Sequence, residues 1–176
     1  MTNKIIIEEI NNPYRSAHEV LTKTLVHDDA ISIPIDVKKI ADLLGIEVQR
    51  LPLEKGTDGL LIKDKAYGNF KAVIDSAASP HRARFTLAHE IGHYVKEYQD
   101  FPAEEVAGIV QKRDDMSSTG KDANEVWANQ FAAYLLMPSG IVKQLWADNM
   151  PIEKMAQLFD VSIASLGHRL ENLGLA

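Results

Sequence analysis

The chain has 176 residues, with 25 Asp and Glu against 19 Lys and Arg, six His and no Cys. The absence of cysteine excludes disulfides, thiol nucleophiles and thiolate-bound zinc or iron–sulfur sites, so any metal must be held by imidazole and carboxylate groups. A formal net charge of −6 has the wrong sign for a protein that binds the phosphate backbone of nucleic acids. The length fits one compact domain with at most a small appendage.

The first half of the chain predicts two helices followed by a small sheet. Apolar residues recur at helical spacing over 17–25, after Pro13, and a second helix is expected from Pro34 to Leu44, where Gly45 stops it. Short runs with strand patterning, separated by turn residues, then predict three strands, of which the last two are antiparallel. These strands are expected at 46–51, 59–62 and 70–74.

The second half is helical by pattern. Apolar spacing predicts helices over 82–96 and 122–136, and Pro138 ends the second of them. The polar stretch 111–122 between them is interpreted as a loop. Three further helices are expected near 138–148, 151–159 and 162–173. Together the elements predict an α+β fold, in which a small three-stranded sheet is packed by helices.

The last helices are interpreted as an extension, residues 139–176, of a main domain that comprises residues 1–138. The two final helices, joined by a tight turn, look like a helix-turn-helix, which is a common reader of DNA. The basic side chains of this segment are outnumbered two to three by acidic ones, so it lacks a phosphate-neutralising face. They are Lys154 and Arg169 against Glu153, Asp160 and Glu171. We expect the extension to pack on the main domain or to recognise a protein, and direct DNA binding to be absent.

No segment resembles a targeting signal or a membrane helix. The N-terminal apolar triplet 5–7 is followed at once by two acidic residues, so we expect no secretory signal. The longest apolar run, 131–137, is far shorter than the ~20 residues that a membrane helix needs. We therefore expect a cytoplasmic protein without membrane contact.

The pentad His89-Glu-Ile-Gly-His93 has the spacing of a metal site on a helix. Residues four apart lie about 40° apart around the axis and about 6 Å along it, so both imidazoles can reach one zinc ion. Glu90 flanks the metal from the same face and is placed to act as a base. Gly92 costs about 1 kcal/mol in helix propensity, which suggests that something approaches the backbone closely there. The pentad alone also occurs by chance on solvated helices.

A catalytic zinc site normally has three protein ligands, so one more must come from elsewhere. Glu97 continues the register of the pentad but lies about 12 Å along the axis from His89, too far for one ion to bridge. The next strong helix carries Glu125 and Asn129, four residues apart on one side. We expect Glu125 to be the third ligand, and Asn129 to orient a ligand histidine through its other ring nitrogen.

Two blocks of the sequence together closely resemble the ImmA/IrrE-type metallo-endopeptidases, gluzincin-like HExxH zinc peptidases. The first runs from Arg82 to His93 and contains F-T-L-A-H-E-I-G-H, and the second runs from Glu125 to Pro138 as E-x-x-A-N-x-F-A-A-x-L-L-M-P. In layout the resemblance covers about residues 15–138.

The resemblance implies that His89, His93 and Glu125 bind zinc and that Glu90 is the catalytic base. It also implies a specific protein substrate, a helix-turn-helix transcriptional repressor of a mobile element or a stress pathway. Strand 70–74 is hypothesised to take up an extended substrate along its edge. The alternative is a non-catalytic regulator, an HExxH scaffold that binds a partner protein or DNA.

A group that stabilises a developing oxyanion is not evident from the sequence. Five side chains qualify by type, and for each the alternative is an ordinary role in the core or at the surface. They are Tyr94, Tyr98, Tyr134, His81 and Arg82.

Overall fold

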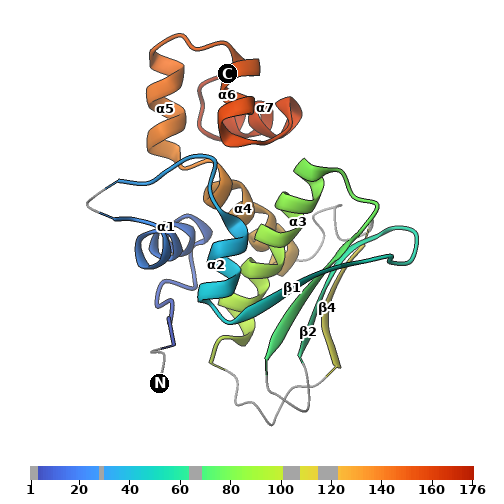
Figure 1. Cartoon of the computed structure of the whole chain (residues 1–176). Coiled ribbons are helices and arrows are strands. Elements are labelled where there is room, and N and C mark those ends of the chain that lie inside the picture. Colours follow the sequence, from blue (N-terminus) through green and yellow to red (C-terminus); the bar gives the residue numbers. More distant parts are fainter. Residues whose placement is uncertain (1–3, 28–29, 64–68, 101–107, 115–122) are drawn as a thin grey trace.

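The computed structural model describes residues 4–27, 30–63, 69–100, 108–114 and 123–176 (Figure 1). In these residues, one mixed sheet lies against a group of helices, and a smaller group of helices, α5 to α7, follows at one end of the molecule. The predicted α+β class is confirmed. None of the helices in the described part of the chain is both long and apolar enough to cross a bilayer.

Two helices open the fold. α1 (Pro13–Thr24) begins after Asn12, whose side chain accepts hydrogen bonds from the first amides of the helix. α2 (Val37–Leu43) begins after Asp36, whose carboxylate accepts the Lys39 amide at 2.9 Å. The predicted start of this helix at Pro34 is therefore wrong, because the capping carboxylate, and not the proline, sets where the helical hydrogen bonds begin.

The sheet has four strands in the order β1-β3-β2-β4, with β1 parallel to β3 and the other pairs antiparallel. The strands are β1 (Ile46–Leu51), β2 (Thr57–Lys63), β3 (Phe70–Asp75) and β4 (Gly108–Asp114). The three predicted strands are present and their last two are antiparallel as predicted. β4 is an addition, since residues 111–114 were predicted to be loop. The remainder of that predicted loop, 115–122, lies outside the described residues.

β3 occupies an inner position of the sheet. It pairs with β1 along one side and with β2 along the other. Both edges of its backbone are thus used inside the sheet, and the hypothesis that strand 70–74 adds a substrate strand is wrong. In the described part of the chain the outer positions belong to β1 and β4.

The longest helices, α3 (Pro80–His93) and α4 (Ala123–Leu136), pack against each other beside the sheet (Figure 1). Ser79 caps the start of α3, and a π-helical turn (Tyr94–Tyr98) follows its end. A Cβ atom added at Gly92 would lie 3.0 Å from a ring carbon of Phe131. The predicted close approach at Gly92 is therefore confirmed, and the approaching element is α4.

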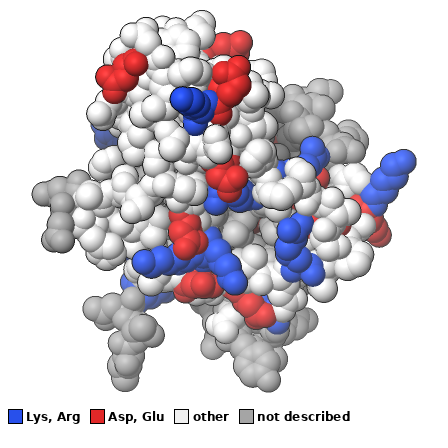
Figure 2. Space-filling view, turned by 45° about the horizontal axis from the view of Figure 1, so that its top comes forward, with Lys and Arg blue, Asp and Glu red and all other residues white. Residues whose placement is uncertain are grey.

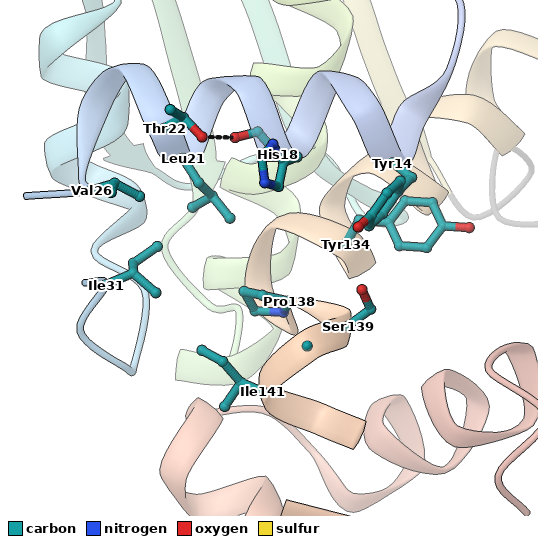
Figure 3. A pocket seen from close by; sticks show the side chains of 11 residues that line it. Tyr14, His18, Leu21, Thr22, Val26, Ile31, Tyr134, Pro138, Ser139 and Ile141 are labelled. Atoms are coloured by element: carbon teal, nitrogen blue, oxygen red, sulfur yellow. Dashed lines mark hydrogen bonds between the residues drawn. The ribbon is translucent and has the colours of Figure 1, made fainter. Parts of the chain in front are cut away.

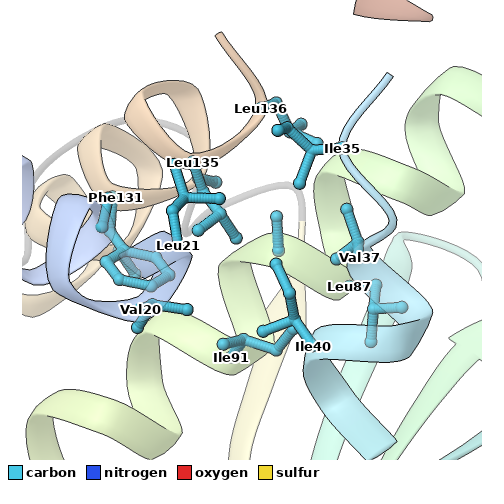
Figure 4. Packing of buried hydrophobic residues seen from close by; sticks show 14 of the residues in the cluster. Val20, Leu21, Ile35, Val37, Ile40, Leu87, Ile91, Phe131, Leu135 and Leu136 are labelled. Carbon is cyan, nitrogen blue, oxygen red and sulfur yellow. The ribbon is translucent and has the colours of Figure 1, made fainter. Parts of the chain in front are cut away.

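The apolar core lies where α1, α2, α3 and α4 meet, as Figure 4 shows. Ile91 of α3 and Phe131 of α4 are fully buried there, and burying a side chain of this size contributes about 1.5–3 kcal/mol. Sheet on one side and helices on the other leave the second half of α3 buried, from Thr86 to His93.

Three helices complete the chain: α5 (Ser139–Ala147), α6 (Ile152–Phe159) and α7 (Ile163–Asn172). Their bounds agree closely with the predicted ones, and Asp160, with a φ of 53°, makes the turn between α6 and α7. Two arginine contacts, one half-buried and one buried, connect them to the preceding helices. Arg84 of α3 donates to the Asp160 carbonyl at 3.2 Å, and Arg169 of α7 donates to the Met137 carbonyl at 3.1 Å. The division into domains at 138/139 stays a prediction.

Candidate metal centre

Three ionisable side chains lie in the second half of α3 and a fourth faces them from α4. His89 and Glu90 are 0% exposed, His93 1% and Glu125 7%. Side chains of these types are seldom buried unless they are paired or bind a metal ion. Their shared burial therefore indicates one joint site and not four unrelated positions.

The ligand atoms of both histidines and of Glu125 converge on one point. The two Nε2 atoms of His89 and His93 are 3.0 Å apart. The Glu125 carboxylate places one oxygen 3.2 Å from Nε2 of His89 and the other 3.0 Å from Nε2 of His93. These three residues form a group able to hold a metal ion, with all ligand atoms within 4.8 Å of one another.

The far side of each imidazole ring determines which nitrogen faces this point. Nδ1 of His89 lies 3.0 Å from Oδ1 of Asn129, and Nδ1 of His93 lies 3.0 Å from Oε1 of Glu97. An amide oxygen and a carboxylate only accept hydrogen bonds, so both Nδ1 atoms are the donors. In the neutral rings, both Nε2 atoms then carry lone pairs that point at each other and at Glu125.

This arrangement of donors fits a small divalent cation. Ligands of a tetrahedral ion at ~2.0–2.1 Å are about 3.3 Å apart, and the observed separations are 3.0–3.2 Å. Lone pairs and a carboxylate at such distances repel one another unless positive charge lies between them. Two imidazoles and one carboxylate also form one of the usual ligand sets of catalytic zinc.

The acidic surroundings favour positive charge at the centre. Burial alone lowers the pKa of His93, but hydrogen bonds to Glu125 and Glu97 and the nearby charge of Glu90 raise it to about 9. Burial raises the pKa of Glu125, whereas its hydrogen bonds to His89 and His93 lower it to about 2. Without metal the site thus holds a proton at neutral pH, in the place that a cation would take.

Glu90 lies on the sheet side of the cluster. Its Oε1 atom is 3.0 Å from the position that a Cβ atom would take at Gly59 of β2. Its charge also raises the pKa of His93, so the carboxylate is close to the metal ligands. On its other side it lies against β2. This is the place where a base is needed if water attacks a group held at the centre.

The five residues that the sequence predicted as metal ligands, base and orienting residue all belong to this one site. The structure brings the two histidines and Glu125 together, with Glu90 beside them and Asn129 behind His89. Sequence reasoning missed Glu97, which it considered only as a ligand and excluded by distance. The sequence did contain an indication of this role. Glu97 follows His93 by four residues, a spacing at which its carboxylate can reach Nδ1 of the His93 ring.

Each of the five side chains considered as an oxyanion stabiliser contacts a group away from the cluster. The pairs are Tyr94 and Tyr98 with Phe70, Tyr134 with Arg169, Arg82 with Asp58, and His81 with Asp160. These are packing or ion-pair contacts. Tyr98 in addition forms a side-chain hydrogen bond with Glu97, the residue that holds the His93 ring.

A cavity of about 270 Å³ lies between α1, α4 and α5, apart from the cluster (Figure 3). Leu21, Val26 and Ile31 form its apolar wall, and Tyr134 and Ser139 border it on another side. It shares no described residue with the metal cluster.

Comparison with known proteins agrees with the geometry of the cluster. A peptidase family model, described as the IrrE N-terminal-like domain, matches residues 41–171, which is well over half of the chain. No curated protein matches the sequence. The family match confirms the resemblance that the two sequence blocks indicated. The chain belongs to the ImmA/IrrE family of metallopeptidases, which is defined by the IrrE N-terminal-like domain.

Proposed function

We propose that this chain is a zinc-dependent endopeptidase that hydrolyses one peptide bond in a specific protein. The observation that carries the proposal is the convergence of His89 Nε2, His93 Nε2 and the Glu125 carboxylate within hydrogen-bond distance of one another. Glu90 lies buried beside them. Family membership supports a metallopeptidase activity in general, and this site is where that activity would reside.

Zinc bound by these three residues would supply Lewis acidity toward the scissile carbonyl and toward water. The protein supplies position and proton transfer. Asn129 and Glu97 hold the two imidazole rings in orientation. Glu90 takes a proton from the attacking water and passes it to the nitrogen of the leaving amine.

Metal content tests the first part of the proposal. The purified chain is expected to hold one zinc ion, counted by inductively coupled plasma mass spectrometry, and His89→Ala is expected to lose it. His168→Ala is the matched control, because His168 is an exposed histidine on α7. A wild-type chain without stoichiometric metal, even after zinc is supplied, would contradict the proposal.

The proposed substrate is a helix-turn-helix transcriptional repressor, and the proposed compartment is the cytoplasm. The resemblance to the family supports the choice of substrate. Co-expression with a repressor encoded beside this chain is expected to yield discrete fragments of that repressor. The fragments should be absent when the Glu90→Gln variant replaces the wild type, and their persistence would contradict the role given to Glu90.

The surface of the C-terminal helices supports a protein substrate over direct DNA binding. Arg169, the only arginine of α6 and α7, is 2% exposed, and its guanidinium stacks 4.3 Å from the ring of Tyr134. It is therefore not available to phosphates. The upper part of Figure 2, which shows this end of the molecule, is mostly uncharged and carries more acidic than basic side chains.

A further inference from the structure

Gly59 interrupts a row of buried positions on β2. Thr57, Gly59, Leu61 and Lys63 alternate with less buried residues, as expected for a strand with one covered face. The neighbours of Gly59 in this row carry side chains and Gly59 carries none. The space that its side chain would take is filled instead from α3.

Two side chains of α3 occupy that space. A Cβ atom at Gly59 would lie 2.5 Å from Cγ2 of Thr86 and 3.0 Å from Oε1 of Glu90. The first distance is shorter than real carbon contacts, and the second is tighter than most. A side chain at this position therefore cannot coexist with the observed places of Thr86 and Glu90.

The backbone of Gly59 does not itself require glycine. Gly45, Gly56 and Gly174 are the described glycines with positive φ, and Gly59 is not among them. Glycine inside a strand also weakens it, and often marks a place where another group approaches closely. Glycine at position 59 is thus not needed for the backbone conformation of the strand. It leaves room for the side chains of α3 that lie beside it.

The adjacent residue ties this part of β2 to the same side of α3. Asp58 forms a two-bond ion pair with Arg82, with distances of 2.7 and 2.6 Å. Arg82, Thr86 and Glu90 follow each other at four-residue spacing, so they lie along one side of the helix. The strand is therefore held against α3, and Glu90 has little room to avoid a new side chain at Gly59.

We propose that Gly59 is a positioning residue for Glu90. Its missing side chain leaves the space in which the Glu90 carboxylate lies beside the metal ligands with β2 behind it. Any side chain at this position displaces the carboxylate from the place where it acts on water. The inference rests on the proposed function, since it takes Glu90 as the base.

The test is the Gly59→Ala variant, compared with the wild type in repressor cleavage. We expect kcat to fall at least tenfold while KM changes little and one zinc ion per chain remains bound. Gly140→Ala is the matched control, because a Cβ atom there meets nothing within 4 Å. It should cleave at the wild-type rate. A Gly59→Ala chain with wild-type kcat would overturn the proposal.

A double variant separates positioning from folding. Adding Thr86→Ser to Gly59→Ala removes the methyl group of the 2.5 Å contact and leaves the 3.0 Å contact with Glu90. Thermal stability should then recover while kcat stays at least tenfold low. If kcat recovers together with stability, the effect belonged to packing and the proposal is wrong.

A spectroscopic measurement separates failure of this proposal from failure of the proposed function. In the cobalt-loaded chain, Glu90→Gln and Gly59→Ala should both change the visible absorption bands of the metal, and Gly140→Ala should not. If the wild type cleaves no repressor, the proposed function fails. If Glu90→Gln changes the bands and Gly59→Ala leaves them as in the wild type, the positioning role fails.

Discussion

At the scale of single residues, the site depends on what stands behind each metal-facing histidine. Asn129 accepts a hydrogen bond from His89, and Glu97 accepts one from His93, both at 3.0 Å. These contacts select the nitrogen that faces the metal and hold the ring in place. Residues in this position typically contribute about 10–100-fold to metal affinity.

Glu97→Gln should therefore weaken zinc binding, because an amide accepts from His93 less strongly than a carboxylate and lacks its charge. We expect an affinity lower by about 10-fold or more, measured by competition with a chromogenic chelator. Glu171→Gln is the control, because Glu171 also contacts a histidine, His168 at 3.3 Å, but on the exposed surface. Equal affinities in both variants would contradict the role of Glu97.

The pKa of His93 makes a prediction about pH. Its raised pKa of about 9 means that the metal-free site is protonated at pH 7, whereas zinc needs the neutral ring. Zinc must then displace one proton, so its affinity should rise about tenfold per pH unit between pH 6 and 8. Chelator competition at several pH values measures the slope. An affinity that does not change with pH would show that His93 is already neutral without metal.

At the scale of elements, the close packing of α3 on α4 brings Glu125 to the histidines. Gly92 permits this packing, since a Cβ atom there would lie 3.0 Å from Phe131 and 3.4 Å from the Cα atom of Ala128. This close packing predicts opposite changes in the free energy of unfolding for two glycine substitutions, one at the helix contact and one away from it.

Gly92→Ala should lower the free energy of unfolding by about 1–3 kcal/mol, because overpacking at the helix contact outweighs the gain in helix propensity. Gly167→Ala in α7 should raise it by up to about 1 kcal/mol, since nothing lies within 4 Å of the added atom. Urea denaturation with excess zinc measures both. Stabilisation by Gly92→Ala would mean that α3 and α4 are not in close contact.

Local pattern predicted most of these elements and the residues of the site. Helical spacing within α3 places two histidines on one face without further information, and the same holds for Glu125 and Asn129 on α4. Their meeting depends on tertiary packing, which local pattern does not encode. The need for a third zinc ligand suggested it, and the family resemblance implied it. β4 was missed because its residues 111–114 are all polar or charged and show no alternation. The inner position of β3 depends on strand order, which periodicity does not encode.

At the scale of the whole molecule, a buried arginine joins the last helix to the rest. Arg169 donates to the Met137 carbonyl at 3.1 Å and stacks on Tyr134. Phe159 of α6 belongs to the same apolar cluster as Phe131 of α4. These contacts predict that the C-terminal helices and the preceding ones unfold together.

Arg169→Ala should lower the free energy of unfolding by about 1.5–3 kcal/mol, as expected for loss of a buried hydrogen bond from a charged group. Lys154→Ala, on the exposed side of α6, should change it by less than about 0.5 kcal/mol. Circular dichroism during urea denaturation should show a single transition. Two separate transitions would indicate that residues 139–176 fold as an independent unit.

The central claim is that Glu90, beside a metal held by His89, His93 and Glu125, acts as the base of a peptidase. Its most direct test is the cleavage rate of the repressor by the zinc-loaded Glu90→Gln chain relative to the zinc-loaded wild type. With one zinc ion bound in each, we predict discrete fragments from the wild type and a rate lower by about 10²–10⁴-fold in the variant. Equal rates in the two chains would contradict the claim.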